Sequence, residues 1–363
     1  MRILQVITSL LTGGAEKLIV DISARLKNYG HDVDVVVFNG ERTPFLDDLN
    51  KTGCRVIKFS EKGSVYNPFY ILKLKNILSE YDIIHTHNTS SQLFTAIANL
   101  FVGKPIVTTE HNTSNRRRNH MLWKPMDRWM YAQYDHIICI SDKAEENLRG
   151  YLGRCATSMS IIYNGIDVER FHSAKEMDNL KSNRFVIVMV SAFRRQKDQR
   201  TLIDAMSLLS DDDYELWLVG DGDLRLDMES YVKQNGIKQQ VCFWGNRNDI
   251  PNILHSADVV CMSSHYEGLS LSSLEGMSVG KPFVATDVDG LREVTQGYGI
   301  LVPHQDAEAL AKVIRQLHDD REYYRQVADA CYERAKQFDI NRMVEAYNNV
   351  YKTMVSSPKS DIV

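Results

Sequence analysis

Short runs of apolar, mostly β-branched residues alternate with longer amphipathic stretches along the chain, a pattern typical of βα units that build parallel sheets. Between the first two runs, residues 16–30 place Leu18, Ile22 and Leu26 on one helical face, and Gly30 can end that helix. The apolar runs of the first half predict these strands: Ile3–Thr8, Val33–Phe38, Arg55–Phe59, Ile83–Thr86, Ile106–Thr109, His136–Ile140 and Ser160–Tyr163.

The periodicity is lost after Gly165, and residues 169–184 are polar enough to be predicted as a linker. A second series of apolar runs follows and predicts these strands: Phe185–Ser191, Glu215–Val219, Val241–Trp244, Val259–Met262 and Pro282–Thr286. We therefore predict two doubly wound α/β domains, residues 1–170 and 171–339. The carboxyl ends of their strands are expected to face one central cleft, which is where open sheets of this kind bind ligands.

Length and composition exclude several classes of protein but do not identify the function. The chain has 363 residues, more than one compact core usually holds, since domains run to roughly 100–200 residues. A net charge of -4 does not fit a general nucleic-acid binder, which would carry a basic excess. The six cysteines are scattered without a CxxC pair, so we expect reduced thiols in a cytoplasmic protein. No run approaches the roughly 18 apolar residues of a spanning helix, so any membrane contact should be peripheral.

A glycine turn, residues 12–16, follows the first predicted strand and opens the first helix. Free backbone N–H groups there would favour an anion near Gly14, although a tight turn that merely needs glycine explains the pattern as well. A nicotinamide enzyme would place an acidic residue at the end of the second strand, but that strand ends in Phe38 and Asn39. A dehydrogenase is therefore disfavoured.

Histidines gather at two strand ends of the first half. His85 and His87 lie two residues apart, so both imidazoles are predicted on one side of their strand. A metal site needs a third ligand, and His111 is the obvious candidate in this half; polar substrate contacts or structural histidines are the alternatives. In a loop at a cleft, His111 could bond a sugar hydroxyl or a phosphate.

A basic and aromatic stretch follows this histidine. Arg116, Arg117 and Arg118 precede Trp123 and Trp129, and such a combination suits an anionic membrane surface or a phosphorylated acceptor. A solvated turn followed by a core helix is the alternative interpretation.

In the second half, basic residues follow an apolar strand. Arg194 and Lys197 at that position suit a diphosphate, one as a planar fork and the other as a point charge, whereas a solvated surface lysine is the alternative. Residues 220–223, Gly-Asp-Gly-Asp, read equally as an acidic metal cluster or as a turn, and residues 211–213 read as a charge run.

Two glutamates stand in the segment HYEGLSLSSLEGMSVGKP. Glu267 lies in the loop after a buried strand, and a helix is predicted from about Ser270 to Val279. Backbone donors of residues 268–270 could meet a diphosphate while Glu267 faces sugar hydroxyls. Glu275 could bind a ligand too, or it could close a capping box with Ser272.

Taken together, these motifs resemble the retaining glycosyltransferases of family 4 over nearly the whole chain. The resemblance rests on their order: GGAEKLIVDIS, HTHN, TTEHN, ISDKAEENL, IYNGIDVERF, FRRQKD, LVGDGDLR, WGNRNDIPNILHSADVV and EGLSLSSLE. Each is weak alone. It implies the GT-B fold of two Rossmann-like domains. The tail, residues 321–354, reads as one or two amphipathic helices with Tyr347 and Tyr351 among their apolar contacts, and by the resemblance a helix at about 340–356 packs back on the N-terminal domain.

The resemblance also implies the chemistry. A hexose or N-acetylhexosamine would pass with retention from a UDP- or GDP-linked donor to a glycan or lipid-linked acceptor, without a cofactor or an obligatory metal. Catalytic roles are implied for His111, Glu267 and Lys197, and acceptor contacts are expected at His87, Asn88 and Arg116. Donor contacts are implied for the following residues: Gly14, Arg194, Lys197, Asn246, Arg247, Glu267, Gly268, Leu269, Ser270 and Glu275.

The chain departs from the family pattern at two places. Ser191-Ala192 stands where many members have Gly-Arg, which moves the arginine role to Arg194, and residues 268–270 read Gly-Leu-Ser where many have Gly-Phe-Gly. A nucleotide-sugar epimerase of the same architecture and a non-enzymatic sugar-nucleotide-binding module are the competing hypotheses. We expect a cytoplasmic enzyme of cell-surface polysaccharide assembly, in contact with the inner face of an anionic membrane.

Overall fold

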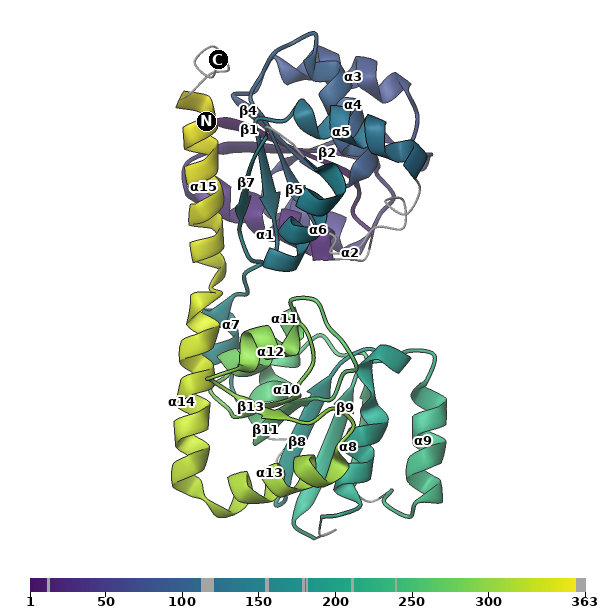
Figure 1. The fold of residues 1–363 in the computed structure, drawn as a ribbon, viewed down its shortest axis with the longest axis vertical. Helices are drawn as coiled ribbons and strands as arrows, with labels where there is room; N and C mark the ends of the chain where they lie inside the picture. The colour runs from purple at the N-terminus through teal and green to yellow at the C-terminus, as the bar shows by residue number, and fades with distance from the viewer. Residues whose placement is uncertain are drawn as a thin grey trace. The chain divides into compact units, whose positions relative to one another are not determined.

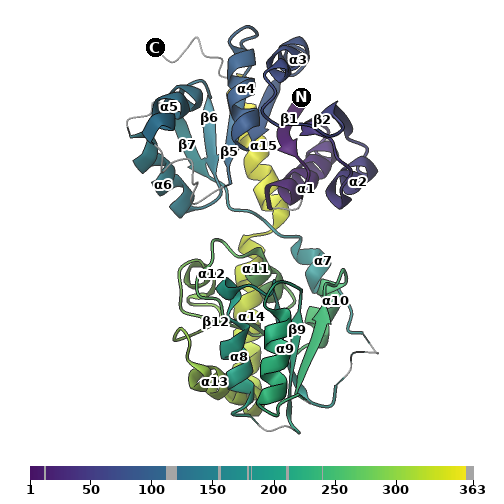
Figure 2. The same cartoon turned by 90° about the vertical axis from the view of Figure 1, so that its right-hand side faces the viewer.

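The computed structural model describes residues 1–11, 14–111, 121–153, 157–177, 180, 182–209, 212–238 and 240–356. The chain divides into two compact units. Unit 1 comprises Met1–Asn164 and Asn341–Val363, and unit 2 comprises Gly165–Ile340. In each unit, helices cover both faces of a central sheet (Figures 1 and 2).

Unit 1 is built on a seven-stranded parallel sheet in the order β3-β2-β1-β4-β5-β6-β7. All seven predicted strands are present. The near-continuous apolar character of β1 and β2 follows from burial on both faces, as helical crossovers require, whereas the outer strands β3 and β7 are only partly buried. The strands are β1 (Arg2–Ser9), β2 (Asp32–Asn39), β3 (Arg55–Ser60), β4 (Ile83–His87), β5 (Ile106–Glu110), β6 (His136–Cys139) and β7 (Ser158–Ile161).

The helices of unit 1 bury their apolar faces against this sheet. The C-terminal helix belongs to this unit, although its sequence lies far from the rest, and it runs beside the strands (Figure 1). The helices are α1 (Gly14–Asn28), α2 (Pro44–Lys51), α3 (Phe69–Leu78), α4 (Thr89–Asn99), the 3-10 helix η2 (Met121–Trp123), α5 (Lys124–Ala132), α6 (Asp142–Leu152) and α15 (Ile340–Ser356).

Unit 2 contains a six-stranded parallel sheet in the order β10-β9-β8-β11-β12-β13. Five strands match the prediction, and the last, only three residues long, was not predicted. The strands are β8 (Phe185–Val190), β9 (Tyr214–Val219), β10 (Val241–Gly245), β11 (Val259–Met262), β12 (Phe283–Thr286) and β13 (Ile300–Val302).

The helices of unit 2 complete a second doubly wound layer structure. The stretch predicted as a linker begins within a short helix, because Val168 and Phe171 are apolar and buried there. The helices are α7 (Val168–His172), the 3-10 helix η4 (Arg195–Lys197), α8 (Gln199–Met206), α9 (Arg225–Gln234), α10 (Ile250–Ser256), α11 (Leu271–Ser278), α12 (Leu291–Thr295), α13 (Ala307–Asp319) and α14 (Arg321–Gln337).

Strand order locates the ligand sites. Counted within its own unit, the sheet has the order 3-2-1-4-5-6-7 in unit 1 and 3-2-1-4-5-6 in unit 2. The strand order therefore reverses between β1 and β4 in unit 1 and between β8 and β11 in unit 2. Loops after the strands on either side of such a switch point diverge and leave a crevice at the carboxyl edge. The predicted fold class is confirmed for both units. In the described part of the chain, no helix is both long and apolar enough to cross a bilayer.

Candidate functional site

The switch point of unit 2 brings two predicted residues together. Lys197 ends η4 in the loop after β8, and Glu267 lies in the loop after β11. The Lys197 Nζ atom lies 2.5 Å from Glu267 Oε1, and the exposed fractions of the two side chains are 19% and 7%. A cation and a carboxylate, 70 positions apart in the sequence, thus form a largely buried ion pair where the fold predicts a ligand.

Further donors fix the Glu267 carboxylate. The Ser264 hydroxyl donates to Oε1 at 2.6 Å, and the Gln196 amide donates to Oε2 at 3.4 Å. A carboxylate can accept about four hydrogen bonds, so it keeps acceptor capacity for the hydroxyl groups of a sugar. Ser264 and Gln196 are contacts of Glu267 that were not predicted from the sequence. Their proximity to the glutamate motif and to Lys197 was the available signal.

The loop after β12 holds the Glu267 backbone in place. The Glu267 N–H donates to the carbonyl of Asp289 at 3.1 Å. Gly290 follows with φ +82°, and a Cβ there would lie 2.4 Å from the Glu267 oxygen and 2.3 Å from the Gly268 oxygen. Only glycine combines this conformation with such close backbone approach. The position of Glu267 therefore depends on a glycine outside the motif that contains it.

Helix α11 begins directly after this loop, close to the predicted start. Its N-cap is Ser270, whose hydroxyl accepts from the Ser273 N–H at 3.3 Å. The capping box proposed for Ser272 and Glu275 is wrong, because the helix begins too early for Glu275 to occupy the third position. The unpaired N–H groups of the first turn and the helix dipole favour an anion at this end.

The other predicted donor residues differ in accessibility. Arg194, Asn246 and Gly268 are exposed, while Leu269 is half-buried and packs against the small cluster that contains Leu274. Arg247 makes a two-bond ion pair with Asp249, at 2.8 and 2.5 Å, and its guanidinium lies 5.6 Å from the Trp244 ring centroid. The Arg247 guanidinium thus already makes two hydrogen bonds to Asp249 within its own loop.

Of the two interpretations of residues 220–223, the structure supports the turn. A Cβ on Gly220 would lie 2.1 Å from the Ser191 oxygen, and one on Gly222 would lie 2.6 Å from the Phe193 oxygen. Both glycines also have φ above +130°. They allow this turn to lie against the loop after β8, and the Phe193 N–H donates to the carbonyl of Asp221 at 3.0 Å.

Unit 1 contains a hydrogen-bonded line of buried polar side chains on three neighbouring strands. Gln5 on β1, His87 on β4 and His111 just after β5 are joined by bonds of 2.8 Å (His87 Nε2 to Gln5 Oε1) and 2.9 Å (His87 Nδ1 to His111 Nε2). The Gln5 amide nitrogen donates to the hydroxyl of Tyr351 on α15 at 3.2 Å. Gln5 was missed, although it is a polar residue inside an apolar strand.

The same hydroxyl also bonds His85, and the bonds set the proton positions. Because Tyr351 accepts from Gln5, its proton points to His85 Nδ1, 2.6 Å away, and His85 Nε2 then donates to the Thr109 hydroxyl at 2.8 Å. Gln5 Oε1 accepts from His87 Nε2, so His87 Nδ1 accepts from His111 Nε2–H. His111 Nδ1 therefore carries a lone pair.

The three imidazoles are uncharged near neutral pH. Burial lowers the pKa of His111 to about 4, and burial together with the neighbouring imidazoles holds the pKa values of His85 and His87 well below their usual range. A neutral His111 with a lone pair on Nδ1 accepts a hydrogen bond from a hydroxyl group. This favours a sugar hydroxyl over a phosphate among the contacts considered for His111.

Two interpretations of the histidine cluster change. Both ring nitrogens of His85 are used by Tyr351 and Thr109, so His85 is structural rather than a metal ligand. His87 is completely buried, so we correct its expected role from acceptor contact to positioning of His111. Asn88 remains half-buried at the start of α4, with φ 71°, and donates to the Thr8 hydroxyl at 3.3 Å.

Gly14 and Arg116 are the remaining predicted site residues of the first half. Gly14 is exposed at the first position of α1, where nothing lies within 4 Å of a would-be Cβ. Arg116, with its two neighbouring arginines, lies outside the described residues. Trp123 of η2 and Trp129 of α5 are 45% and 39% exposed, whereas Met130 and Tyr131 of α5 are buried. This segment therefore combines a core face with exposed tryptophan rings.

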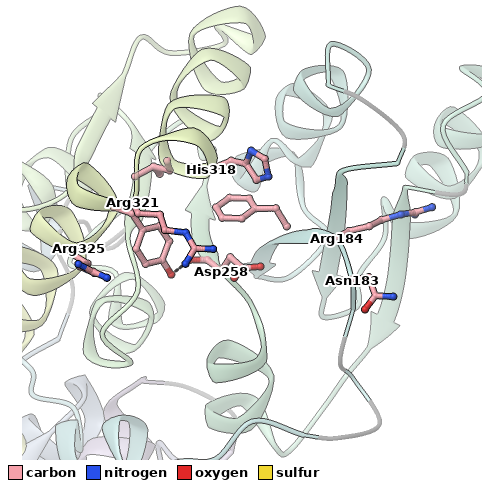
Figure 3. Close-up of a pocket in the computed structure, with 9 residues that line it drawn as sticks. Asn183, Arg184, Asp258, His318, Arg321 and Arg325 are labelled. Carbon is pink, nitrogen blue, oxygen red and sulfur yellow. Dashed lines mark hydrogen bonds between the residues drawn. The ribbon is translucent and has the colours of Figure 1, made fainter.

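A cavity of about 510 Å³ occupies the opposite edge of the unit 2 sheet (Figure 3). Asn183 and Arg184 precede β8 and Asp258 precedes β11, so this cavity lies at the amino ends of the strands. Arg184 and Arg325 lie on opposite sides of Asp258, and they do not converge on a single point (Figure 3). This cavity is thus separate from the Lys197–Glu267 site, which lies at the carboxyl ends of the strands.

Comparison with known proteins bears on these observations. The model of Glycosyltransferase Family 4 matches residues 12–170, and that of Glycosyl transferases group 1 matches residues 172–337. The UDP-Gal:alpha-D-GlcNAc-diphosphoundecaprenol alpha-1,3-galactosyltransferase of Escherichia coli is 26% identical over 371 residues, which is 95% of each chain. The N-acetyl-alpha-D-glucosaminyl L-malate synthase of Bacillus anthracis is 26% identical over 377 residues, 96% of each. A crystal structure of HepE from Anabaena in complex with UDP has a TM-score of 0.81 at 23% identity, and the match covers 97% of this chain and 100% of that one.

Proposed function

Because this chain belongs to the group 1, family 4 glycosyltransferases, enzymes of the GT-B fold, we propose that it moves a hexose or N-acetylhexosamine from a UDP-linked donor with retention of anomeric configuration. We assign donor binding to unit 2 and the acceptor side to unit 1. The Lys197–Glu267 pair at the β8/β11 switch point carries the proposal, since it joins a phosphate-binding cation to a hydroxyl-binding carboxylate.

Each group in this site has a separate task in the proposed reaction. Lys197 Nζ and the first-turn N–H groups of α11 stabilise the negative charge that develops on the departing diphosphate. Glu267, fixed by Ser264 and Lys197, accepts hydrogen bonds from sugar hydroxyls and so orients the ring. Glu275 is assigned to the ribose hydroxyls, and Arg194 to the diphosphate.

The chemical step that we propose needs no protein nucleophile. The bond between the anomeric carbon and the diphosphate oxygen breaks, and the acceptor oxygen bonds to the same face of that carbon. The acceptor proton passes to the leaving diphosphate. The protein contributes positioning and electrostatic stabilisation.

Two observations support the choice of donor and acceptor. The name of the Escherichia coli relative gives a UDP-sugar donor and a polyprenyl-diphosphate acceptor, and HepE was crystallised with UDP. Exposed Leu122, Trp123 and Trp129 would suit the interface of an anionic membrane, where a lipid-linked acceptor resides. We propose a lipid-linked glycan acceptor, as in cell-surface polysaccharide assembly, and peripheral contact with the membrane.

The test uses the full chain with single UDP- and GDP-sugars and polyprenyl-diphosphate-linked saccharides. Mass spectrometry should detect a glycosylated product, and NMR should show the anomeric configuration of the donor retained. Glu267→Gln should lower kcat by about 10²- to 10³-fold, and Glu275→Ala should weaken donor binding. Glu229→Gln is the matched control, because Glu229 is an ion-paired carboxylate of the same unit, paired with Arg225 at 2.9 Å. Sugar isomerisation without an acceptor would replace the transferase by an epimerase, and unchanged kinetics in Glu267→Gln would remove the assigned role.

A further inference from the structure

Three side chains with metal-ligating atoms converge beside the donor site of unit 2. Asp198, His265 and His304 each offer one ligand atom, and these atoms all lie within 4.8 Å of one another. Asp198 follows β8, His265 follows β11 and His304 follows β13, so the carboxyl ends of three parallel strands meet here. The sequence pattern suggested a metal site at the histidines of the first half and at residues 220–223, but not at these three residues.

Two of the three distances between these atoms are close to the spacing of ligands around a cation, and the third is at most 4.8 Å. His265 Nδ1 lies 2.8 Å from His304 Nε2 and 3.5 Å from Asp198 Oδ2. Ligands of a tetrahedral zinc ion with bonds of about 2.0–2.1 Å are about 3.3 Å apart, so the two distances lie on either side of the ideal value. The two imidazole rings are nearly perpendicular, at 88°.

Hydrogen bonding alone leaves one contact unsatisfied. If His265 Nδ1 carries a proton, that proton can point to His304 or to Asp198, but not to both. If Nδ1 carries a lone pair instead, that lone pair faces the Asp198 carboxylate. A cation that accepts all three lone pairs satisfies every atom at once.

The supporting contacts resemble those of a ligating carboxylate. Thr201 Oγ1 donates to Asp198 Oδ2 at 2.7 Å, and outer partners of this kind orient metal ligands. Asp198 is only 8% exposed, and it adopts a left-handed conformation with φ 47°. Gln305, next to His304, has φ 60°. Aspartate adopts this conformation occasionally, whereas for glutamine it is costly, so the surroundings of Gln305 must determine its position.

We propose that Asp198, His265 and His304 bind one divalent cation of the zinc type. Two imidazoles and a carboxylate are typical ligands of Zn²⁺, and the fourth position stays open for water. His304 is exposed, which gives the cation a route of entry. The cation joins the loops after β8, β11 and β13, and Lys197 and Glu267 lie within two residues of its ligands. Its role is structural, and it does not depend on the proposed transfer reaction.

The test measures metal binding by the chelator-treated full chain at pH 7.5. Competition with a chromophoric chelator should find one tight Zn²⁺ equivalent, and Co²⁺ should give the strong visible absorption of a four-coordinate ion. His304→Ala, at an exposed position, should weaken the affinity by at least about 100-fold, since the loss of an outer-shell partner alone costs 10- to 100-fold. Asp198→Asn should do the same while its side-chain oxygen still caps α8.

His318→Ala is the matched control. His318 is also an exposed histidine of unit 2 with a carboxylate partner, Asp319, at 2.8 Å. It should keep the tight equivalent. The proposal is overturned if the wild type binds no tight equivalent, if His304→Ala retains it, or if His318→Ala loses it as well. None of these outcomes depends on glycosyltransferase activity.

Discussion

Removal of the Tyr351 hydroxyl should destabilise unit 1 far more than removal of the neighbouring Tyr347 hydroxyl. Both tyrosines lie on α15, both are completely buried, and both rings pack beside His85 at centroid distances of 5.6 Å. Tyrosine to phenylalanine keeps the ring in each case. The comparison therefore isolates the hydroxyl groups.

The magnitude follows from the bonds that each hydroxyl makes. Tyr351 donates to His85 Nδ1 and accepts from Gln5, and both partners are fully buried. Two buried groups left without a partner cost about 1–3 kcal/mol each, so Tyr351→Phe should lower the free energy of unfolding by about 2–6 kcal/mol. Tyr347 has one long bond, 3.3 Å to Thr109, and Thr109 still accepts from His85. Tyr347→Phe should cost about 0.5–1.5 kcal/mol.

The assay is native-state hydrogen exchange on the backbone amides of β1 and β4, which reports the opening of unit 1 separately from unit 2. Nitrogen NMR of the imidazoles supplies a second readout. Without Tyr351 the Gln5 amide is free to turn over, so the Nε2–H tautomer of His111 should lose its dominance, whereas Tyr347→Phe should preserve it. Equal destabilisation by the two variants, or an unchanged tautomer in Tyr351→Phe, would refute the inferred direction of the hydrogen-bonded line.

Two further predictions concern the stability of unit 1 at acid pH and the backbone geometry at Gly290. The folded-state pKa values of His85, His87 and His111 lie below the ordinary value of about 6.5. The free energy of unfolding of unit 1 should thus be highest above pH 6.5 and decline towards pH 4, because these imidazoles take up protons in the unfolded chain and stay neutral in the folded one. Urea midpoints measured across this range should show the decline. A flat profile would contradict the neutral state of the buried histidines. As a control, the variant His318→Gln at an exposed position should show the same pH profile as the wild type. In unit 2, Gly290→Ala should weaken donor binding in calorimetry by at least about tenfold, because about 1.4 kcal/mol suffices for that factor and the new Cβ meets the backbone of Glu267. Gly297→Ala is the control, with the same φ of +82° and nothing within 4 Å; equal losses in both variants would mean that strain alone, and not the contact with Glu267, is responsible.

The central strands were predictable because they are buried on both faces, which makes β1, β2 and β8 nearly continuous apolar runs. β13 escaped prediction because three residues, Ile300–Val302, are too few to show a pattern. The capping box at Ser272 failed for a different reason. Ser270 and Ser272 can each cap a helix, and Glu275 stands three residues after Ser272, as a capping box requires. Only the backbone geometry shows that Ser270 is the N-cap.

Some residues of the candidate site could be predicted from the sequence, but their contacts could not. Lys197 and Glu267 were found from their positions after strands, but their direct pairing depends on the adjacency of β8 and β11. Likewise, His87 was placed correctly on its strand, yet its burial depends on Gln5 and on α15. The hydrogen bonds of the Tyr351 hydroxyl could not be predicted, because the hydrophobic pattern treats tyrosine as an apolar residue.

The electrostatic character of the two units supports the division of labour proposed for them. The switch point of unit 2 contains a cation and a carboxylate at 2.5 Å, beside the positive end of α11, and such a site can hold the charged diphosphate and the polar sugar of a nucleotide donor. At the switch point of unit 1, burial keeps the imidazoles neutral and the hydrogen-bonded line from Tyr351 leaves His111 as an acceptor. An uncharged acceptor selects hydroxyl groups and gives little attraction to a phosphate. The chemistry at each switch point therefore matches a different part of the transfer reaction, the anionic leaving group in unit 2 and a neutral hydroxyl in unit 1.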